Sequence, residues 1–440
     1  MNTAIAPKQF PHGPKRRYPG EFLLRLTRDP LGFLQHMSQF GSVTGLKLGK
    51  LRVILLNRPE LIHEVLVSNA SNYVKGRGLE VAKRLLGEGL LTSEDPLHKQ
   101  QRHLLQPVFQ PRKVDLFAPT VSQCSESLLE SWPDQGTISA SPEMTRLTLQ
   151  IVGQSLFGSN LEGDVSEVRS AMEEAVEVFR LCSLPFYELG EKLFPLLRRR
   201  PAQVRARLDA VVGRIIQEHR SCPHQDLLGR MVASKMADEQ LRDEAMTLFL
   251  AGHETTAHAL TFALYLLSRH PDQQHKVRKQ ILEVAGDGPI GANQIDSLTD
   301  LKQCLLETLR LFPTAWMIGR RSREDCTLGE YDIPAGTTVL MSPYLMHRNA
   351  AYFEQPESFW PERWQLHPRT SLPKQSYFPF GAGPRVCIGE HFAWLEMMIG
   401  LGTILRHYEL GPCPVNQPKL RTGITLAPGQ DLPIPVTRIG

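Results

Sequence analysis

The feature that most constrains the fold of this chain is a loop, rich in glycine, that carries Cys387. It reads Phe380-Gly381-Ala382-Gly383-Pro384-Arg385-Val386-Cys387-Ile388-Gly389 and runs directly into an apolar helical stretch. The glycines allow backbone conformations and close approaches that a Cβ atom would forbid, and Pro384 stiffens the turn. We expect a sulfur beside Arg385 and at the start of a helix to have a lowered pKa. The resulting thiolate is the form of cysteine that binds a metal.

A lone cysteine near a turn is more often a buried structural residue than a metal ligand. Here the spacing Phe-x-x-Gly-x-Arg-x-Cys-x-Gly resembles the haem-thiolate signature of the cytochrome P-450 monooxygenases. In that family a cysteine thiolate ligates haem iron and favours O–O cleavage. The resemblance implies that Cys387 ligates the iron of haem b, and that Phe380, Arg385 and Gly389 contact the cofactor.

A second pattern is Glu307-Thr308-Leu309-Arg310, in which one helical turn puts Glu307 and Arg310 on the same face. An exposed pair would contribute only a few tenths of a kcal/mol, but its neighbours are mostly apolar and we expect it to be buried. Buried charges need further partners, and Arg363 in Pro361-Glu362-Arg363-Trp364 is a candidate. These stretches resemble the Glu-x-x-Arg helix and the Pro-Glu-Arg-aromatic meander of the family. The resemblance implies a structural role for the three charged residues.

A third pattern lies inside a long apolar run without proline and reads Ala251-Gly252-His253-Glu254-Thr255-Thr256. Adjacent threonines and a glycine are poor choices for the middle of a helix. Either they are tolerated on a solvent-facing side, or Gly252 leaves room for a ligand toward which a threonine hydroxyl turns. The stretch resembles the oxygen-activation helix of the family. By that resemblance Thr255 holds oxygen at the iron, Glu254 relays protons, and Ala251 and Gly252 face the haem.

His98 and Arg102 are four residues apart and share one face of a predicted helix. Two donors on one face suit carboxylates, although basic helix faces are usually only solvated. The matching helix of the family carries Trp or His followed four residues later by Arg, and both bind a haem propionate. The resemblance implies the same role here. Arg385 and Arg320 are candidates for the second propionate, with Arg321 in place of Arg320 if the register differs by one residue.

Length, composition and charge favour one large domain. A chain of 440 residues is long enough for two or three domains, but no linker rich in Gly, Ser or charge divides it. We expect a proline-rich N-terminal segment over residues 1–20 and a single haem domain over 21–440. The formal net charge of +4, with both signs interspersed, argues against nucleic acid as a partner.

Cysteine usage and hydropathy indicate the compartment. The seven cysteines include no Cys-x-x-Cys, which fits a reducing compartment, and no apolar run is long enough for a membrane span or a secretion signal. We therefore expect a monomeric, cytoplasmic protein of the bacterial type. The chain ends soon after the haem motif, so no bound flavin is expected and electrons come from a ferredoxin or flavodoxin with its reductase. The basic cluster of Lys99, Arg102, His103 and Lys113 is either the docking site of this electron donor or an ordinary solvated surface.

Hydrophobic periodicity assigns most of the chain to helix, at 28–40, 59–68, 144–157, 164–181, 202–219, 239–270, 273–284 and 300–311. Alternation about a glycine predicts a hairpin over 43–56, and further strands are expected at 337–342 and near 422–426. The predicted fold class is therefore mainly α with small β-sheets. This is the cytochrome P-450 fold, in which a long oxygen-activation helix lies over the haem.

The expected substrate is lipophilic, because the candidate pocket walls are apolar or bulky: Leu85, Leu86, Leu90, Leu91, Leu248, Trp316, Met317 and Ile424. A further apolar cluster between residues 179 and 194 is either a lid or helix packing. Stretches such as Asp29-Pro30-Leu31-Gly32-Phe33 resemble bacterial relatives that hydroxylate sesquiterpenes such as pentalenene. Relatives that act on fatty acids contain similar stretches, and a terpenoid is favoured over a fatty acid.

The resemblance implies a monooxygenase that inserts one atom of O2 into a C–H bond. A haem-thiolate peroxygenase or isomerase is one alternative, but such relatives often lack the acid and threonine that stand here as Glu254 and Thr255. A haem-binding sensor without catalysis is the other alternative, and it would need no proton relay.

Overall fold

The computed structural model describes residues 9–49, 51–158, 199–221, 226–234, 236–286 and 288–439, together with Glu174 and Val178. Most of the helix expected over 164–181, and the apolar cluster between residues 179 and 194, lie outside the described residues.

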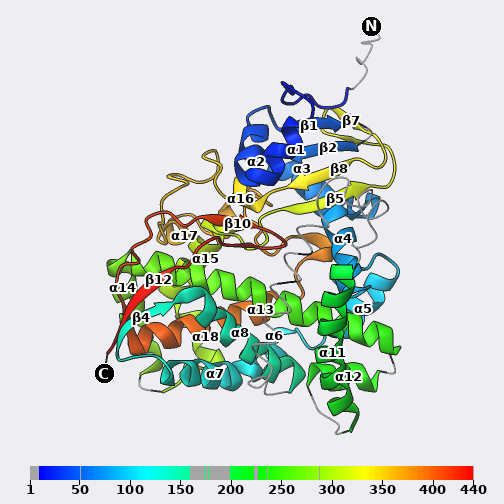
Figure 1. The fold of residues 1–440 in the computed structure, drawn as a ribbon. Coiled ribbons are helices and arrows are strands. Elements are labelled where there is room, and N and C mark those ends of the chain that lie inside the picture. Colours follow the sequence, from blue (N-terminus) through cyan, green and yellow to red (C-terminus); the bar gives the residue numbers. More distant parts are fainter. Residues whose placement is uncertain are drawn as a thin grey trace.

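A body of helices makes up most of the molecule, and a region of strands lies beside it (Figure 1). The longest helix, α13 (Asp238–Ser268), crosses the middle of this body and packs against α8 (Ala140–Phe157). Helix α18 (Glu390–His407) packs against α13 and α7 (Ala118–Glu130). Among the described residues, four further helices belong to this body: α11 (Arg199–Ser221), α12 (Leu227–Ala233), α14 (Pro271–Ala285) and α15 (Thr299–Leu311).

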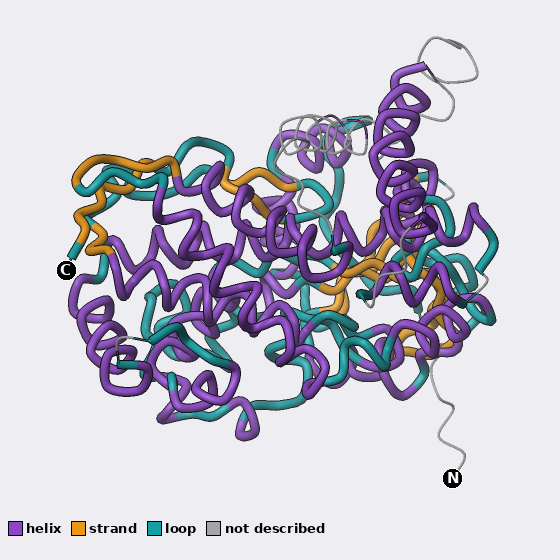
Figure 2. The backbone as a smooth tube through the Cα atoms, turned by 90° about the horizontal axis from the view of Figure 1, so that it is seen from below, coloured by secondary structure: helices purple, strands orange, loops and turns teal. Residues whose placement is uncertain are grey.

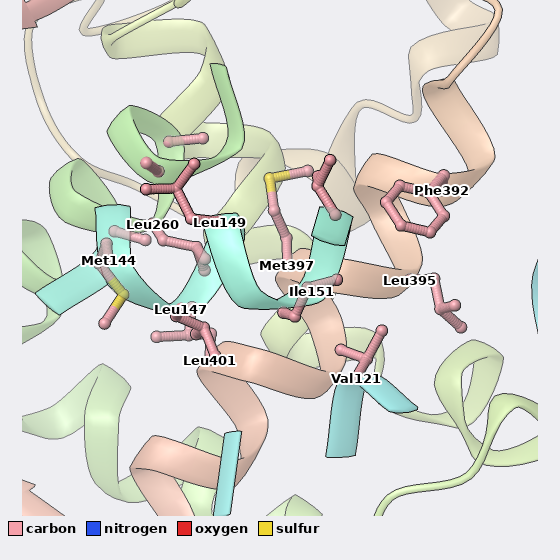
Figure 3. Packing of buried hydrophobic residues seen from close by; sticks show 14 of the residues in the cluster. Val121, Met144, Leu147, Leu149, Ile151, Leu260, Phe392, Leu395, Met397 and Leu401 are labelled. Atoms are coloured by element: carbon pink, nitrogen blue, oxygen red, sulfur yellow. The ribbon is translucent and has the colours of Figure 1, made fainter. Parts of the chain in front are cut away.

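The core lies where α8, α13 and α18 meet (Figure 3). Leu147 of α8, Leu260 of α13 and Leu401 of α18 have no exposed surface. The second half of α13 is buried on all sides, from Thr256 to Ser268. A helix that is apolar around its whole circumference belongs in the interior of a protein, which explains why the continuous apolar run of the sequence forms the central helix.

The main sheet has five strands in the order β1-β2-β8-β5-β3. The predicted hairpin is confirmed, because β1 and β2 pair antiparallel with Val43 opposite Leu56. In the same sheet β3 pairs antiparallel with β5, and this register sets Lys75 opposite Arg320. The strands are β1 (Val43–Leu48), β2 (Leu51–Leu56), β3 (Tyr73–Lys75), β5 (Ile318–Ser322) and β8 (Thr338–Met341).

The described residues form three smaller sheets, two along the helical body and the third beside the main sheet (Figure 1), and Figure 2 shows the molecule from below. The strand expected near 422–426 is divided in two: Thr422 ends β10 and Leu426 begins β11, and the residues between them form a turn in which the Gly423 amide donates to the Thr425 carbonyl. The strands of the small sheets are β10 (Leu420–Thr422) with β11 (Leu426–Pro428), β4 (Gln135–Ser139) with β12 (Pro433–Arg438) and β9 (Tyr408–Leu410), and β6 (Cys326–Leu328) with β7 (Tyr331–Ile333).

The other described helices pack either against the main sheet or against the helical body. Helix α2 starts at Pro30 instead of residue 28, because the Asp29 carboxylate accepts a hydrogen bond from the Gly32 amide and caps the helix. The helix expected over 59–68 is confirmed as an α-helical turn followed by a π-helical turn. These helices are α1 (Glu21–Arg28), α2 (Pro30–Ser38), α3 (Pro59–His63), η1 (Glu64–Ser68), α4 (Arg77–Leu86), α5 (Leu97–Leu105), α6 (Pro111–Val114), α16 (Pro343–Met346) and α17 (Arg363–Leu366).

The expected class, mainly α with small β-sheets and one long central helix, is confirmed. Within the described part of the chain, no helix combines the length and the apolar character that a membrane crossing requires.

Candidate active site

The loop that carries Cys387 depends on its glycines. Gly381 and Gly383 have φ angles of 75° and 70°, a region that favours glycine. A Cβ atom on Gly383 would lie 1.9 Å from the carbonyl oxygen of Leu66, so the loop packs directly on η1. The Cys387 amide donates to the Phe380 carbonyl at 2.9 Å, which closes the loop just before α18 begins.

The Cys387 sulfur opens into a cavity, and its electrostatic setting differs from the prediction. Burial raises the pKa of this thiol to about 11, and Glu390 adds to the effect, against smaller opposing contributions from the Gly389 amide and Arg102. The predicted lowering by Arg385 is wrong, because the guanidinium of Arg385 is bound to the Glu94 carboxylate instead. A coordinated metal cation removes the proton from its thiol ligand, so the charge of a bound metal would be needed to keep this sulfur anionic.

One cavity of about 1920 Å³ brings the predicted site residues together. Trp316 and Met317 reach it from the segment before β5, and Ile424 reaches it from the turn between β10 and β11. Leu85, a further candidate for the pocket wall, does not line it. The predicted residues that line the cavity are Leu86, Leu90, Leu91, His98, Arg102, Leu248, Ala251, Gly252, Glu254, Thr255, Trp316, Met317, Arg320, Phe380, Arg385, Cys387, Gly389 and Ile424.

Basic side chains crowd one wall of this cavity. Burial, followed by the charge of Arg385, lowers the pKa of Arg320 to about 10. Burial, followed by the charges of Lys75 and Arg385, lowers the pKa of His98 to about 4. Crowded, buried basic groups of this kind need anions to stabilise their charged forms. Two carboxylates of a bound ligand would supply the missing negative charge.

The structure separates the two arginines between which the sequence left a choice. Arg321 points away from the cavity and pairs with Glu80 at 2.5 Å on the surface. Arg320 lines the cavity and is 8% exposed. Lys75 and Glu94 were not predicted from the sequence, because neither belongs to a recognised motif. They join this wall only through the pairing of β3 with β5 and through the loop that precedes α5.

The hydroxyl of Thr255 on α13 does not turn away from its own helical turn, contrary to expectation. Thr255 Oγ1 donates to the Ala251 carbonyl at 2.9 Å. Gly252 leaves little free space either, because a Cβ atom there would lie 3.1 Å from a methyl group of Val152 on α8. Gly252 and Thr255 therefore lie in a regular stretch of α13 that borders the cavity.

Glu254 has two partners that the sequence analysis did not identify. Its Oε1 accepts from Thr425 Oγ1 at 2.8 Å and lies 3.6 Å from His258 Nε2. Burial acts to raise the pKa of Glu254, but the two histidines His258 and His253 and the Thr425 hydroxyl outweigh it, leaving the pKa below its ordinary value. The i, i+4 spacing of Glu254 and His258 was a signal in the sequence, whereas Thr425 comes from a distant turn.

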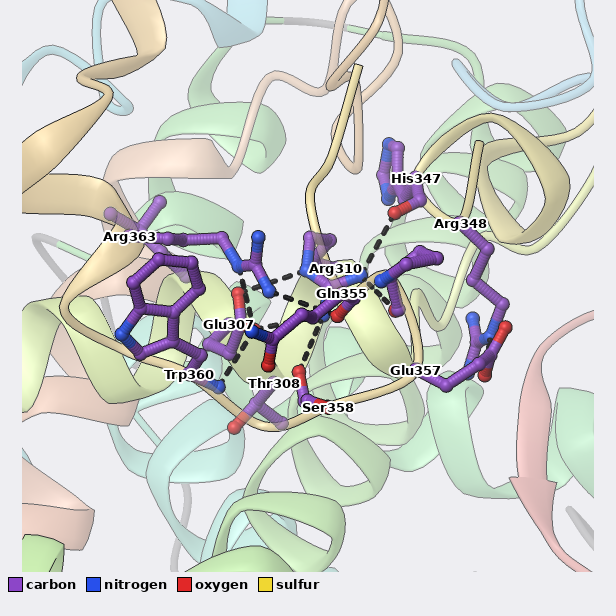
Figure 4. A network of polar contacts seen from close by, with 12 residues as sticks. Glu307, Thr308, Arg310, His347, Arg348, Gln355, Glu357, Ser358, Trp360 and Arg363 are labelled. Atoms are coloured by element: carbon purple, nitrogen blue, oxygen red, sulfur yellow. Dashed lines mark hydrogen bonds and ion pairs between the residues drawn. The ribbon is translucent and has the colours of Figure 1, made fainter. Parts of the chain in front are cut away.

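A buried ionic network lies behind the cavity (Figure 4). The side chains of Glu307 and Arg310 have no exposed surface, and two hydrogen bonds of 2.8 and 2.9 Å join them. Arg363 Nε donates to Glu307 at 3.0 Å, as does the indole of Trp364. Each oxygen of the buried carboxylate therefore accepts more than one hydrogen bond, which is the condition under which a buried charge is tolerated.

The same network fixes the irregular segment between α16 and α17. Arg310 donates to the carbonyl groups of His347, Pro356 and Ser358 at 3.0, 2.5 and 2.9 Å. Arg363 donates to the carbonyl of Glu354 at 2.6 Å. A segment without regular structure thus has its backbone acceptors satisfied by two buried guanidinium groups.

The cavity residues fit a flat iron macrocycle with two acidic groups. Within the described residues, no group of three or more His, Cys, Asp or Glu is placed to hold a bare metal ion. Arg385 Nη1 is buried and has no hydrogen-bond partner in the described part of the chain, and this leaves a donor for an acidic group of the ligand. The residues are those expected for haem and its propionates.

Comparison with known proteins gives the family. The family model described as Cytochrome P450 matches residues 11–430. The cyclooctatin synthase of Streptomyces melanosporofaciens is 33% identical over 94% of this chain and 93% of its own length. Cyclooctat-9-en-7-ol 5-monooxygenase of the same organism is 31% identical over 89% of this chain and 87% of its own, and the pentalenene oxygenase of Streptomyces avermitilis is 28% identical over 88% of each. This chain therefore belongs to the cytochrome P450 family: it is a monooxygenase that carries haem b, acts on a lipophilic substrate with O2 and receives its electrons from a redox partner.

Proposed function

We propose that this cytochrome P450 hydroxylates a terpenoid hydrocarbon. Support comes from the relatives, because the names of the second and third, Cyclooctat-9-en-7-ol 5-monooxygenase and Pentalenene oxygenase, denote oxygenases of terpenoids. The observation that carries the proposal for this chain is the chemistry of the pocket walls. The candidate substrate contacts are all uncharged, and they offer burial of apolar surface with few directional contacts: Leu86, Leu91, Leu248, Trp316, Met317 and Ile424.

We assign three roles to other predicted residues of the cavity: ligation of the iron, binding of the propionates and movement of protons. We propose Cys387 as the iron ligand, in the loop whose conformation the glycines permit. His98 and Arg102 would bind one propionate, and Arg320 and Arg385 the other. When bound, haem b supplies the oxygen chemistry, and the chain supplies binding, orientation and protons.

Proton movement is assigned to α13. Glu254 lines the cavity and is ionised over a wider pH range than an ordinary glutamate, because its pKa is lowered. Thr255 also lines the cavity, one residue along the helix. Glu254 would take up protons from the side of Thr425 and His258, and the Thr255 hydroxyl would pass them into the cavity.

A fatty acid is the second candidate. The lining of the cavity includes Arg16, Arg28 and Arg421 in addition to its apolar walls, and a guanidinium group at the mouth suits a carboxylate.

A ligand screen tests the substrate class. Terpenoid hydrocarbons and long-chain fatty acids are titrated into the haem protein, and the shift of the haem absorption from low spin to high spin is recorded. We expect terpenoids to produce the shift, because an apolar molecule placed over the haem excludes water from the iron. A shift with fatty acids but with no terpenoid would overturn the terpenoid proposal.

The variant Thr255→Ala tests the proton assignment. We expect product per pair of electrons to fall by about tenfold or more, since a positioned proton donor contributes about 10²–10⁴-fold, while the reduced cofactor is still consumed and peroxide is released. Thr261→Ala is the matched control, because its hydroxyl also bonds to its own helix, at the Ala257 carbonyl, and does not line the cavity. Unchanged coupling in Thr255→Ala would remove the assigned role.

The electron donor is proposed to be a ferredoxin or flavodoxin that binds at the basic cluster. Lys99, His103 and Lys113 are exposed, as a docking surface requires, whereas Arg102 is half-buried and donates to the Val386 carbonyl. The monomeric state and the cytoplasmic location remain predictions.

A further inference from the structure

A short loop between α4 and α5 forms one wall of the substrate cavity. We call residues 87–94 the pocket loop. Leu90 and Leu91 of this loop line the cavity directly, and Leu86 lines it from the last position of α4. The shape of the wall therefore depends on what holds the backbone of the pocket loop.

The peptide groups of Leu90 are held from both sides by buried ionisable side chains. The Leu90 amide donates to Glu244 Oε2 at 2.9 Å, and the Leu90 carbonyl accepts from Lys75 Nζ at 2.8 Å. Glu244 has no exposed surface and Lys75 is 5% exposed. Lys75 also donates to the Ser93 carbonyl at 2.6 Å, and Gln240 donates to Glu244 Oε1 at 3.2 Å.

The start of the pocket loop rests directly on α13. The Glu88 amide donates to Asp243 Oδ2 at 2.6 Å. A Cβ atom on Gly87 would lie 2.0 Å from the Asp243 carboxylate, and one on Gly89 would lie 2.1 Å from Thr247 Oγ1. Both glycines therefore allow the backbone of the pocket loop to lie close against side chains of α13.

The end of the pocket loop is tied to the basic wall beside the haem. Glu94 accepts a hydrogen bond of 2.5 Å from the Lys75 amide and also binds the Arg385 guanidinium. Lys75 thus contacts the pocket loop through its side chain and through its own backbone. The substrate wall and the proposed propionate site share this lysine and this glutamate.

Holding the pocket loop with buried ionisable groups lowers the free energy of unfolding. Burial raises the pKa of Glu244 to about 7 and lowers the pKa of Lys75 to about 7, so both groups are partly deprived of their ordinary charge near neutral pH. A neutral side chain would stabilise the fold more simply, since buried charges are often replaceable by apolar residues without loss. What the pair provides instead is a fixed position for the two peptide groups on either side of the Leu90 Cα atom.

We propose that Glu244 and Lys75 are positioning residues that set the substrate specificity of this enzyme by fixing both peptide groups of Leu90, and with them the wall of the cavity. The proposal rests on the assignment of this cavity as the substrate site. Neither residue needs to touch the substrate. Each acts through the backbone of the pocket loop.

The first experiment measures the pocket loop itself. Hydrogen exchange of the peptides that cover residues 87–94 is followed by mass spectrometry in the haem-loaded wild type, in Glu244→Leu and in Lys75→Met. Loss of a buried acceptor should speed exchange in the loop by about tenfold or more. Glu244→Gln keeps an acceptor oxygen and should change exchange much less. Glu239→Leu, an exposed glutamate on the same helix, is the matched control.

The second experiment measures selectivity without needing the natural substrate. The probes are 4-phenylimidazole and the much larger econazole, two azoles that bind haem iron and change its absorption. In Glu244→Leu the ratio of their Kd values should change by about tenfold, because a loosened wall discriminates less by size. Lys75→Met removes the other anchor and should shift the ratio in the same direction, so the result does not depend on one variant folding.

Unchanged exchange in the pocket loop of both Glu244→Leu and Lys75→Met would overturn the anchoring. Faster exchange with an unchanged azole ratio would overturn the role in specificity and leave an ordinary structural contact. Neither readout involves terpenoids, so failure of the terpenoid proposal is recognised separately, by the ligand screen.

Discussion

Replacing Cys387 with serine is expected to abolish the long-wavelength absorption band of the reduced carbon monoxide complex, the band from which the family takes its name. The substitution leaves the backbone unchanged, so the amide of residue 387 still donates to the Phe380 carbonyl and the loop is expected to keep its shape. The serine side chain does not supply the soft, electron-donating thiolate on which this band and O–O cleavage depend. Monooxygenase turnover should fall to background.

The control is Cys326→Ser, which changes a cysteine on β6 outside the cavity lining. It should keep both the band and the turnover. Haem content and far-UV circular dichroism of both variants show whether the fold is retained. A Cys387→Ser protein that binds haem and keeps the band would refute the assignment of the ligand.

Replacing Arg310 with alanine is expected to cost about 3–5 kcal/mol of the free energy of unfolding, because it leaves the Glu307 carboxylate buried with one of its two guanidinium partners removed. Since a domain has about 5–15 kcal/mol in total, little folded protein should accumulate. The three carbonyl groups of His347, Pro356 and Ser358 would also lose a donor. Urea unfolding and the yield of haem-containing protein measure the effect.

Two further variants sharpen this test. Lys302→Ala removes a cation from the same helix, α15, but its pair with Asp296 is exposed and should contribute less than about 1 kcal/mol. Arg310→Lys keeps the charge and loses the planar fork, so it should recover only part of the stability. If Arg310→Ala and Lys302→Ala unfold at the same urea concentration, the buried network is not what stabilises the region behind the cavity.

Short motifs predicted the cavity residues well for a physical reason. A cysteine loop, an oxygen helix and a basic helix face each need particular residue types at fixed offsets, and such offsets are visible in one dimension. Cys387, Thr255 and Arg102 come from distant parts of the sequence and line the same cavity. The central helix was equally predictable, because its apolar run has no break.

Residues whose roles depend on long-range pairing were not predictable. Lys75 has meaning only once β3 pairs with β5, and Thr425 only once its turn reaches α13. Glu244 could have been singled out from the sequence, because a carboxylate directly before a long apolar run needs an explanation. The direction of the Cys387 pKa was wrong for a similar reason, because sequence proximity to Arg385 says nothing about which carboxylate that arginine binds.

The contact between Gly383 and the Leu66 carbonyl has a consequence for anyone who wishes to alter this enzyme. The π-helical turn over residues 64–68 widens the helix where the cysteine loop rests on it, so the two segments form a matched pair. Libraries for directed evolution should leave both untouched and diversify Leu90 and Leu91 instead, which line the cavity. Grafting the cysteine loop into another scaffold would require transplanting that turn along with it.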